Sequence, residues 1–413
     1  MKIRRRTVLM EHSMQSFKCI GSACEDTCCS VWNVTIDQET YRKYQKVRDP
    51  ELKKLLNANV TRNRSTPSEN NYAKIRLTKD RLCPLLTEDN LCKVQAKLGS
   101  EYLSSVCAFY PRFENMVNGV VEKSLVVSCP EAARHVLLNV DGIEFDEIEE
   151  PIETKTFLDC RLNTDDLVHI GKYHKYFWEF RIFTIQTLQN RQHELWKRLI
   201  ILGMFYQKIQ ECIDEGHENE IPGQIAVFSD LVADGLFKKT LDEIPDQSTI
   251  QMLLLKEMTE NRILAGGASK RFIECFAEFL AGIGFLEGST MEEVAKRYQV
   301  AFENHYNPFM QKHEYILENY LVNYVFKNLF PITAKKTLFE NYVMLVVHYA
   351  IIKMHLIGIA GFYGGISIDQ TIKTISSFAR TVEHNANYLR TILDLLRKNG
   401  YTNMAYMAIL IKN

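Results

Sequence analysis

The cysteines of this chain are distributed unevenly, and this constrains its fold more than any other feature. Eight of the eleven lie between residues 19 and 129, spaced C-x4-C-x3-CC, then 53 residues, then C-x8-C-x14-C-x21-C. The adjacent pair in the first group cannot comfortably form a disulfide with itself, but its two thiolates can reach one metal centre or two neighbouring groups. The eight are Cys19, Cys24, Cys28, Cys29, Cys83, Cys92, Cys107 and Cys129.

The start of the chain carries no pattern typical of secretion. KIRRRTVLMEHS has a basic cluster, but only the short apolar run VLM follows it, whereas a signal peptide has a longer apolar stretch. We therefore expect a cytoplasmic protein. In a reducing compartment a dense cysteine cluster is more often a metal site than a disulfide framework. The alternative is a set of buried, metal-free thiols.

The residues themselves leave the identity of the metal open. An iron–sulfur cluster and a four-thiolate zinc site both take all-cysteine ligation. No histidine lies at zinc-finger spacing within the cluster, since His12 precedes it and His135 follows it. The spacing also leaves open whether there are one or two centres.

The sequence predicts a mainly α protein with a small cysteine-rich α+β metal-binding domain at the N-terminus and a larger all-helical domain after it. We place these at residues 1–135 and 161–413, with a linker at 136–160. In the first part, Asp37 is a plausible helix N-cap, Asn118-Gly119 predicts a tight hairpin, and Pro130 suits the first turn of a helix.

Helical periodicity dominates the second part. In HELWKRLIILGMFYQKIQECI the apolar positions step by three and four residues, which is typical of an amphipathic helix facing a core. The stretch 342–363 is apolar enough to suggest a membrane span, but it contains His348, Lys353 and His355, so we expect a buried helix. The formal net charge of −1 gives no reason to expect nucleic acid or an acidic membrane as a partner.

Several motifs together resemble one known family, the bacterial flagellin lysine-N-methylases, which are related to a broader group of zinc- or iron-chelating domains. The resemblance spans about residues 6–395 and has one departure, Ala379, where we expect a serine. The motifs, in chain order, are FKCIGSACEDTCC, CPLLTEDNLCKVQAKLGSEYLSSVCAFYPR, EKSLVVSCPEAAR, ENYLVNYVFKNLFP, the helix at 342–358 and SFARTVEHNANYL.

The resemblance implies methyl transfer from S-adenosylmethionine to lysine side chains of flagellin, with an iron–sulfur cluster, of the 4Fe-4S type, as the metal centre. The usual cofactor signatures are missing. LAGIGFLEG (280–288) follows a helical stretch and is better explained as a closely packed helix end than as a nucleotide loop. The radical signature C-x3-C-x2-C is absent because Cys29 follows Cys28 at once.

Polar residues on two predicted helices are the candidates for the remaining chemistry. Arg380, Glu383 and His384 would share a helical face with Asn387, and we predict Glu383 or His384 as the base for the lysine. The alternative is a solvated surface with a local Arg–Glu pair. As cofactor-binding residues we predict Asn319, Asn323, Arg380 and, beside Cys107, Arg112; the alternatives are buried residues with backbone partners and an exposed loop arginine.

Two other functions fit the same cysteines. One is a zinc-stapled module that binds flagellin or another protein without catalysis, and the other is an iron–sulfur electron carrier. His348 and His355, seven residues apart, are expected to be packing residues instead of ligands. The sequence does not define an oligomeric state.

Overall fold

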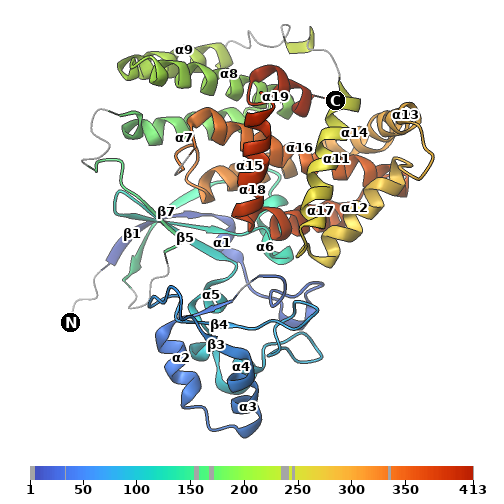
Figure 1. Ribbon diagram of the computed structural model, residues 1–413. Helices are drawn as coiled ribbons and strands as arrows, with labels where there is room; N and C mark the ends of the chain where they lie inside the picture. The colour runs from blue at the N-terminus through green and yellow to red at the C-terminus, as the bar shows by residue number, and fades with distance from the viewer. Residues whose placement is uncertain are drawn as a thin grey trace.

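The structure is a computed structural model that describes residues 5–32, 34–152, 158–166, 172–233, 241–243, 247–333 and 336–412. Figure 1 shows three parts: a lobe at the bottom built from α2 to α5 and a small sheet, a central sheet, and a helical region above it. We call residues 28–107 the thiol lobe. The mainly α class that the sequence predicts is confirmed.

The central sheet has five strands in the order β7-β1-β6-β5-β8. β1 runs parallel to β6 and antiparallel to β7, while β5 is antiparallel to β6 and parallel to β8. The turn between β5 and β6 is the predicted hairpin, in which Asn118 and Gly119 both have positive φ. The strands are β1 (Arg5–Glu11), β5 (Arg112–Val117), β6 (Val120–Leu125), β7 (Phe145–Pro151) and β8 (Cys160–Leu162).

This sheet changes the predicted domain organisation. The range 136–160 was expected to be a linker, but Phe145–Pro151 forms β7 and pairs with all seven residues of β1. The thiol lobe is therefore inserted between β1 and β5 of a sheet that packs against the helices. Phe17, Leu125 and Val127 belong to the same apolar core as the helical region, whereas the lobe has a separate core. Whether either part folds alone remains a prediction.

Short elements make up the thiol lobe. Its three-stranded sheet has the order β2-β4-β3, with β2 (Thr35–Ile36), β3 (Val60–Arg62) and β4 (Ala73–Ile75). Asp37 caps α2 as predicted, because its side chain accepts a hydrogen bond from the Thr40 amide. The helices are α2 (Gln38–Gln45), α3 (Pro50–Asn59), α4 (Lys93–Leu98) and α5 (Ser105–Phe109).

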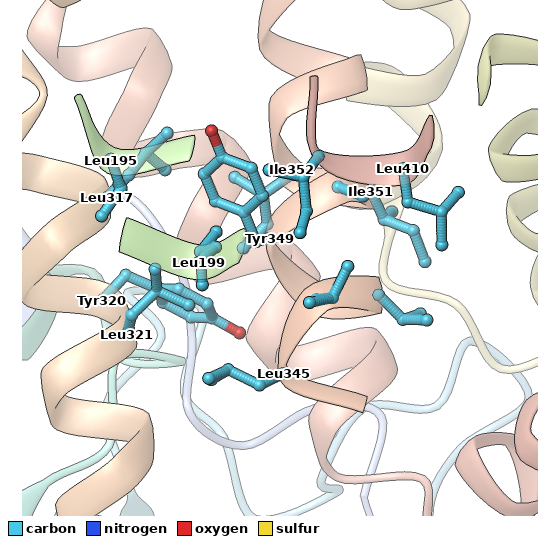
Figure 2. Close-up of a cluster of buried hydrophobic side chains, with 14 of the residues drawn as sticks. Leu195, Leu199, Leu317, Tyr320, Leu321, Leu345, Tyr349, Ile351, Ile352 and Leu410 are labelled. Atoms are coloured by element: carbon cyan, nitrogen blue, oxygen red, sulfur yellow. The ribbon is translucent and has the colours of Figure 1, made fainter. Parts of the chain in front are cut away.

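The helical region surrounds α16 (Leu338–Tyr363), the one helix in the described part of the chain long and apolar enough to span a membrane. Its apolar window is completely buried within the protein, so it is a core helix, as expected. Figure 2 shows its leucine, isoleucine and tyrosine side chains packed against α8 (Leu195–Asp214), α15 (Tyr315–Lys327) and α19 (Met404–Ile411). His348 and His355 are buried on α16 among aromatic rings, which confirms them as packing residues.

The glycine-rich stretch at 280–288 ends a helix, as the sequence suggests. Gly282 is the last residue of α12 (Lys270–Gly282), and a Cβ placed on it would lie 1.8 Å from the Gly358 carbonyl oxygen of α16. Its lack of a side chain therefore allows two helices to approach closely. The remaining helices are α1 (Ser13–Ser16), α6 (Pro130–Leu137), α7 (Phe177–Leu188), α9 (Ile221–Ala233), α11 (Ser248–Leu264), α13 (Met291–Ala301), α14 (Asn307–His313), α17 (Ile368–Phe378) and α18 (Ala386–Lys398).

The predicted helix over 371–398 is interrupted. Between α17 and α18 the backbone forms a π-helix, η8 (Ala379–Glu383), and then breaks at His384 and Asn385. A π-helix inserts an extra residue per turn and is often found at functional sites. Across this break the predicted shared face forms only in part: Arg380 and His384 both contact Ser128 and Trp32, whereas Glu383 contacts Lys327.

Candidate functional site

Five of the eight clustered cysteines line one cavity of about 80 Å³ in the thiol lobe. Hydrogen bonds and turns within the lobe bring these cysteines to the cavity. The Cys83 amide donates to the Cys29 carbonyl over 2.8 Å, a turn brings Cys92 back beside Leu86, and the Ser104 side chain caps the helix that carries Cys107. The cavity is lined by Cys28, Cys29, Cys83, Cys92 and Cys107, together with Trp32, Tyr44, Tyr110 and apolar side chains.

The donor set suits a group that binds thiolates. All of these cysteines are free thiols, and the Sγ atoms of Cys28 and Cys29 lie 4.0 Å apart. Two thiolates on one zinc ion would be separated by roughly 3.8 Å, since each Zn–S bond is about 2.3 Å in tetrahedral geometry. Within the described residues, however, no three Cys, His, Asp or Glu side chains converge closely enough to hold a single ion. The metal-binding character of the lobe remains a prediction.

Burial keeps most of these thiols protonated when no cation is near. It raises the pKa of Cys83 to about 11 and that of Cys107 to about 12. The pKa of Cys29 is also raised, first by its contact with Cys28, whereas the same contact lowers the pKa of Cys28 to about 7. Only a bound cation would stabilise several thiolates together in this cavity.

The other three clustered cysteines lie outside the cavity lining. Cys19 is exposed, while Cys24 and Cys129 are partly buried. Cys129 is the N-cap residue of α6, and Pro130 occupies the first turn of that helix as predicted. Burial raises the pKa of Cys129 to about 11, with a further contribution from the charge of Cys24.

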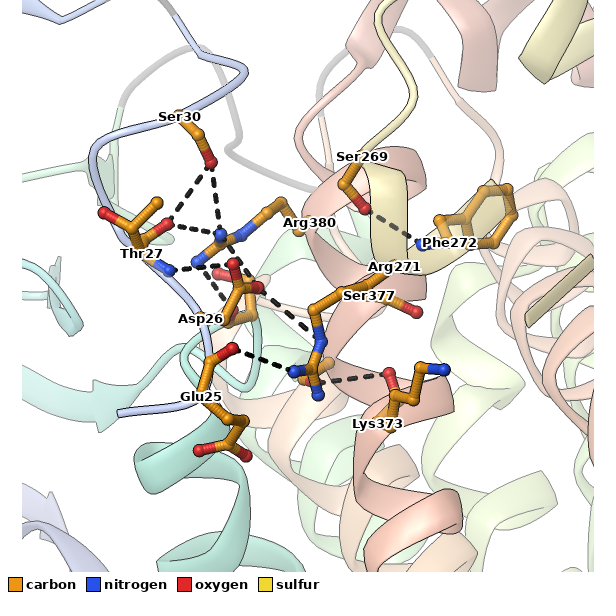
Figure 3. Close-up of polar contacts among 12 residues, drawn as sticks. Glu25, Asp26, Thr27, Ser30, Ser269, Arg271, Phe272, Lys373, Ser377 and Arg380 are labelled. Carbon is orange, nitrogen blue, oxygen red and sulfur yellow. Dashed lines mark hydrogen bonds and ion pairs between the residues drawn. The ribbon is translucent and has the colours of Figure 1, made fainter. Parts of the chain in front are cut away.

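Arg380 links the thiol-bearing segments to the helical region (Figure 3). Its guanidinium Nη1 donates to the Thr27 carbonyl over 2.6 Å and lies 3.0 Å from the Asp26 carboxylate. Nη2 donates to the Ser128 carbonyl over 3.3 Å. The guanidinium also lies over the Trp32 ring, 5.4 Å from its centroid. Arg380 thus contacts groups on both sides of the cysteine cluster.

Glu383 lies in a buried ion pair instead of on a solvated surface. Its carboxylate accepts from Lys327 Nζ and from the Tyr320 hydroxyl, each over 2.7 Å. Although burial alone would raise its pKa, Lys327 and the hydrogen bonds lower it to about 2. Glu383 is therefore an anion at neutral pH and, in this pairing, a weak base.

His384 connects this buried pair to the wall of the thiol cavity. Its Nε2 lies 3.0 Å from Ser128 Oγ, which in turn lies 3.1 Å from the Tyr110 hydroxyl. The Trp32 ring packs edge-on against both the Tyr110 and His384 rings. Burial lowers the pKa of His384 to about 4, so the imidazole is neutral at neutral pH. His384 thus contacts Trp32, which lines the cavity, and reaches Tyr110 through Ser128.

The four residues predicted to bind a cofactor are not brought together around one cavity. Asn319 donates to the carbonyls of Leu137 and Asn139, while Asn323 donates to Glu11 and to the Leu125 carbonyl. The Arg112 guanidinium packs over the Phe17 ring, with its Cζ atom 5.3 Å from the ring centroid. With Arg380 bound to the cysteine segments, all four side chains contact other parts of the protein.

Sequence reasoning missed Asp26, Trp32 and Ser128, which connect the cysteines to the helical region. The available signal was their position, because Asp26 lies between two cysteines and Ser128 directly precedes another. Their partners, Arg380 and His384, lie more than 250 residues away along the chain.

The chain is similar to known methylating enzymes over most of its length. Residues 181–410 match the model of the FliB lysine N-methylase C-terminal domain. A lysine-N-methylase of Salmonella typhimurium is 25% identical over 376 residues, and one of Salmonella choleraesuis is 24% identical; each alignment covers 90% of both chains. The flagellar biosynthetic protein FliU of Salmonella muenchen is 34% identical over 132 residues, covering 32% of this chain and 77% of its own. No solved structure matches.

These similarities define the class of protein: a protein-lysine N-methyltransferase, which here has a helical region and an inserted cysteine-rich lobe. More closely, the chain belongs to the FliB lysine N-methylase family. This confirms the family that the sequence motifs indicate, and it favours an enzyme over a binding module without catalysis.

Proposed function

We propose that this protein transfers methyl groups from S-adenosylmethionine to lysine side chains of flagellin in the cytoplasm, and that its thiol lobe binds an iron–sulfur cluster. The observation that carries the proposal is the cavity lined by five free thiols, whose lining residue Trp32 packs against His384, the neighbour of the buried Glu383. The flagellar name of one relative supports a flagellar protein as the substrate.

The spread of the thiols favours a cluster over a single ion. Thiolates that bind different iron atoms of a cluster can lie further apart than thiolates that share one ion, and here no three converge on one point within the described residues. Cys29, Cys83, Cys92 and Cys107 belong to one lobe and pack around its apolar core, so we assign them as ligands first. Zinc is the alternative metal, and the close pair Cys28 and Cys29 would suit it.

The chemistry on the substrate side needs an unprotonated lysine amine. When bound, S-adenosylmethionine supplies an electrophilic methyl group, and the amine must present its lone pair to it. A substrate lysine that is buried on binding would have a lowered pKa, because burial disfavours the ammonium form. Glu383 and His384 stay our predictions for the residues that receive or orient its proton.

Mass spectrometry of flagellin co-expressed with this protein tests the proposal. We expect flagellin lysines to gain about 14 Da per methyl group. Cys83→Ser should abolish this gain, whereas Cys275→Ser, which alters a buried thiol of the helical region, should retain it. If flagellin co-expressed with the wild-type protein gains no methyl groups, the result would contradict flagellin as the substrate.

A further inference from the structure

Arg380 holds a position that its predicted role as a cofactor ligand does not explain. Its side chain comes from the π-helix η8 of the helical region, is almost completely buried, and ends among the cysteine-bearing segments. Figure 3 shows the guanidinium between the loop of residues 25–30 and the helical region. Arg380 therefore contacts the helical region and the cysteine-bearing loop at once.

The same guanidinium bonds to the peptide carbonyls that directly precede two different cysteines. Nη1 donates to the Thr27 carbonyl, which precedes Cys28, and Nη2 donates to the Ser128 carbonyl, which precedes Cys129. These two cysteines are far apart in sequence and lie on different parts of the fold. A planar guanidinium with several fixed donors can bond two carbonyls at once, which a lysine ammonium on a flexible stem does less well.

The loop that carries Cys28 has little structure of its own. Its internal hydrogen bonds are short-range, such as Cys29 amide to Thr27 Oγ1 over 3.2 Å and Ser30 Oγ to the Thr27 carbonyl over 3.3 Å. Asp26 adds an ion pair with Arg380 at 3.0 Å. A charge-assisted contact of this kind is stronger than a neutral hydrogen bond, particularly when the cation is buried.

We propose that Arg380 is a positioning residue that holds the segments of Cys28, which lines the thiol cavity, and of Cys129, which lies outside it, so that the helical region orients Cys28 for a thiophilic metal. The inference rests on the proposed metal site, although the positioning itself does not need the metal to be present. It also connects a helical-region motif to the N-terminal cysteines: Asp26 and the Thr27 carbonyl, which lie between Cys24 and Cys28, both contact Arg380 of η8.

Arg271 provides a matched control. It is another arginine of the helical region at the same loop, and it donates to the Glu25 carbonyl over 3.2 Å and lies 3.9 Å from Asp26. It contacts only the 25–26 side of the loop and is more exposed than Arg380. Its removal should therefore loosen one cysteine segment, whereas removal of Arg380 should loosen both.

Amide hydrogen exchange on the full-length protein as purified separates these cases. In Arg380→Gln we expect exchange to accelerate about tenfold or more in peptides covering both 24–30 and 126–130. In Arg271→Gln, amide exchange should accelerate only in the peptide that covers 24–30. Unchanged exchange at 126–130 in Arg380→Gln would overturn the proposal. If Arg380→Gln does not fold, the same exchange measurement is made on Arg380→Ala with added guanidinium. Restored protection of both peptides would support the proposal, and unrestored protection would contradict it.

A titration with Co²⁺ under anaerobic conditions measures the consequence for the metal. Loss of a residue that orients ligands typically weakens metal binding about 10- to 100-fold, and we expect this for Arg380→Gln but not for Arg271→Gln. Equal affinity and equal thiolate absorption in wild type and Arg380→Gln would contradict the positioning role. A wild-type protein that binds no Co²⁺ through its thiols would instead contradict the proposed metal site, and the exchange measurement would still decide the role of Arg380.

Discussion

The thiol lobe and the helical region differ in how their cores are built. The lobe packs short strands and helices around a small apolar core that includes Cys83 and is bordered by Cys29, Cys92 and Cys107. The helical region surrounds α16, whose apolar stretch is fully buried, with long helices and a much larger core. A small core of short elements buries little apolar area, so a bound metal would contribute a large share of the stability of the lobe.

Buried polar groups show the same difference. In the helical region they are paired: Lys327 with Glu383, and Arg198 with Glu318 at 2.7 Å. In the lobe they include Asp37, which accepts from Thr40 and Ser105, together with thiols whose pKa values burial raises. The helical region thus carries paired charges within its own sequence, whereas the lobe gathers thiols whose thiolate forms a bound cation would stabilise.

The largest expected effect is on the lobe alone. Cys107→Ser, or removal of the metal with a chelator, should unfold residues 28–107 and leave the helical region folded, because only the lobe depends on the metal. Hydrogen exchange should show loss of protection in α2 to α5 with α16 still protected. Cys212→Ser, at a buried thiol of the helical core, is the control and should leave the lobe protected. Simultaneous unfolding of both parts would break the distinction.

The next largest effect should fall on the helical region. Lys327→Met removes the cation from a pair in which both side chains are almost completely buried and leaves the Glu383 charge without its partner. Such a change costs about 3–5 kcal/mol. We expect a lower free energy of unfolding by chemical denaturation, and a smaller loss in the double variant Lys327→Met, Glu383→Gln. A double variant as unstable as the single one would argue that the charge is not the cause.

The smallest effect concerns pH. Burial among phenylalanine rings lowers the pKa of His355 to about 4, below its ordinary value of 6.5. The unfolded chain therefore binds a proton before the folded protein does, and stability is fully present above pH 6.5 and falls as pH drops toward 4. Relative to His355→Leu, the wild type should lose about 1.4 kcal/mol per pH unit within this window. Parallel curves for the two proteins would exclude this contribution.

Local signals in the sequence predicted many elements of the fold. The Asp37 cap, the Asn118-Gly119 hairpin and the buried helix at 342–363 are confirmed because each depends on neighbouring residues or on periodicity. The central sheet was missed, since β1 and β7 pair across more than 130 residues and β7 alternates charged side chains that resemble a solvated linker. Long-range pairing of this kind leaves no short-range pattern.

The candidate site shows the same limit. The cysteines were found from their spacing, but the sequence could not show which of them share a cavity, because loops of up to 53 residues separate them. The periodicity predicts a continuous helix around Arg380, but the structure has a π-helix there, with Arg380 and His384 both at Ser128 and Glu383 at Lys327. The distribution of Arg380, Glu383 and His384 among the Cys28 loop, Lys327 and Ser128 follows from tertiary packing.

The central claim is that the thiol lobe binds an iron–sulfur cluster, and metal analysis of the freshly purified protein tests it most directly. The protein should be purified without oxygen and assayed for iron, acid-labile sulfide, zinc and visible absorption. The account predicts a brown protein that absorbs at roughly 400 nm and contains iron and sulfide in equal amounts. A colourless protein with one equivalent of zinc, or with no metal, would contradict it.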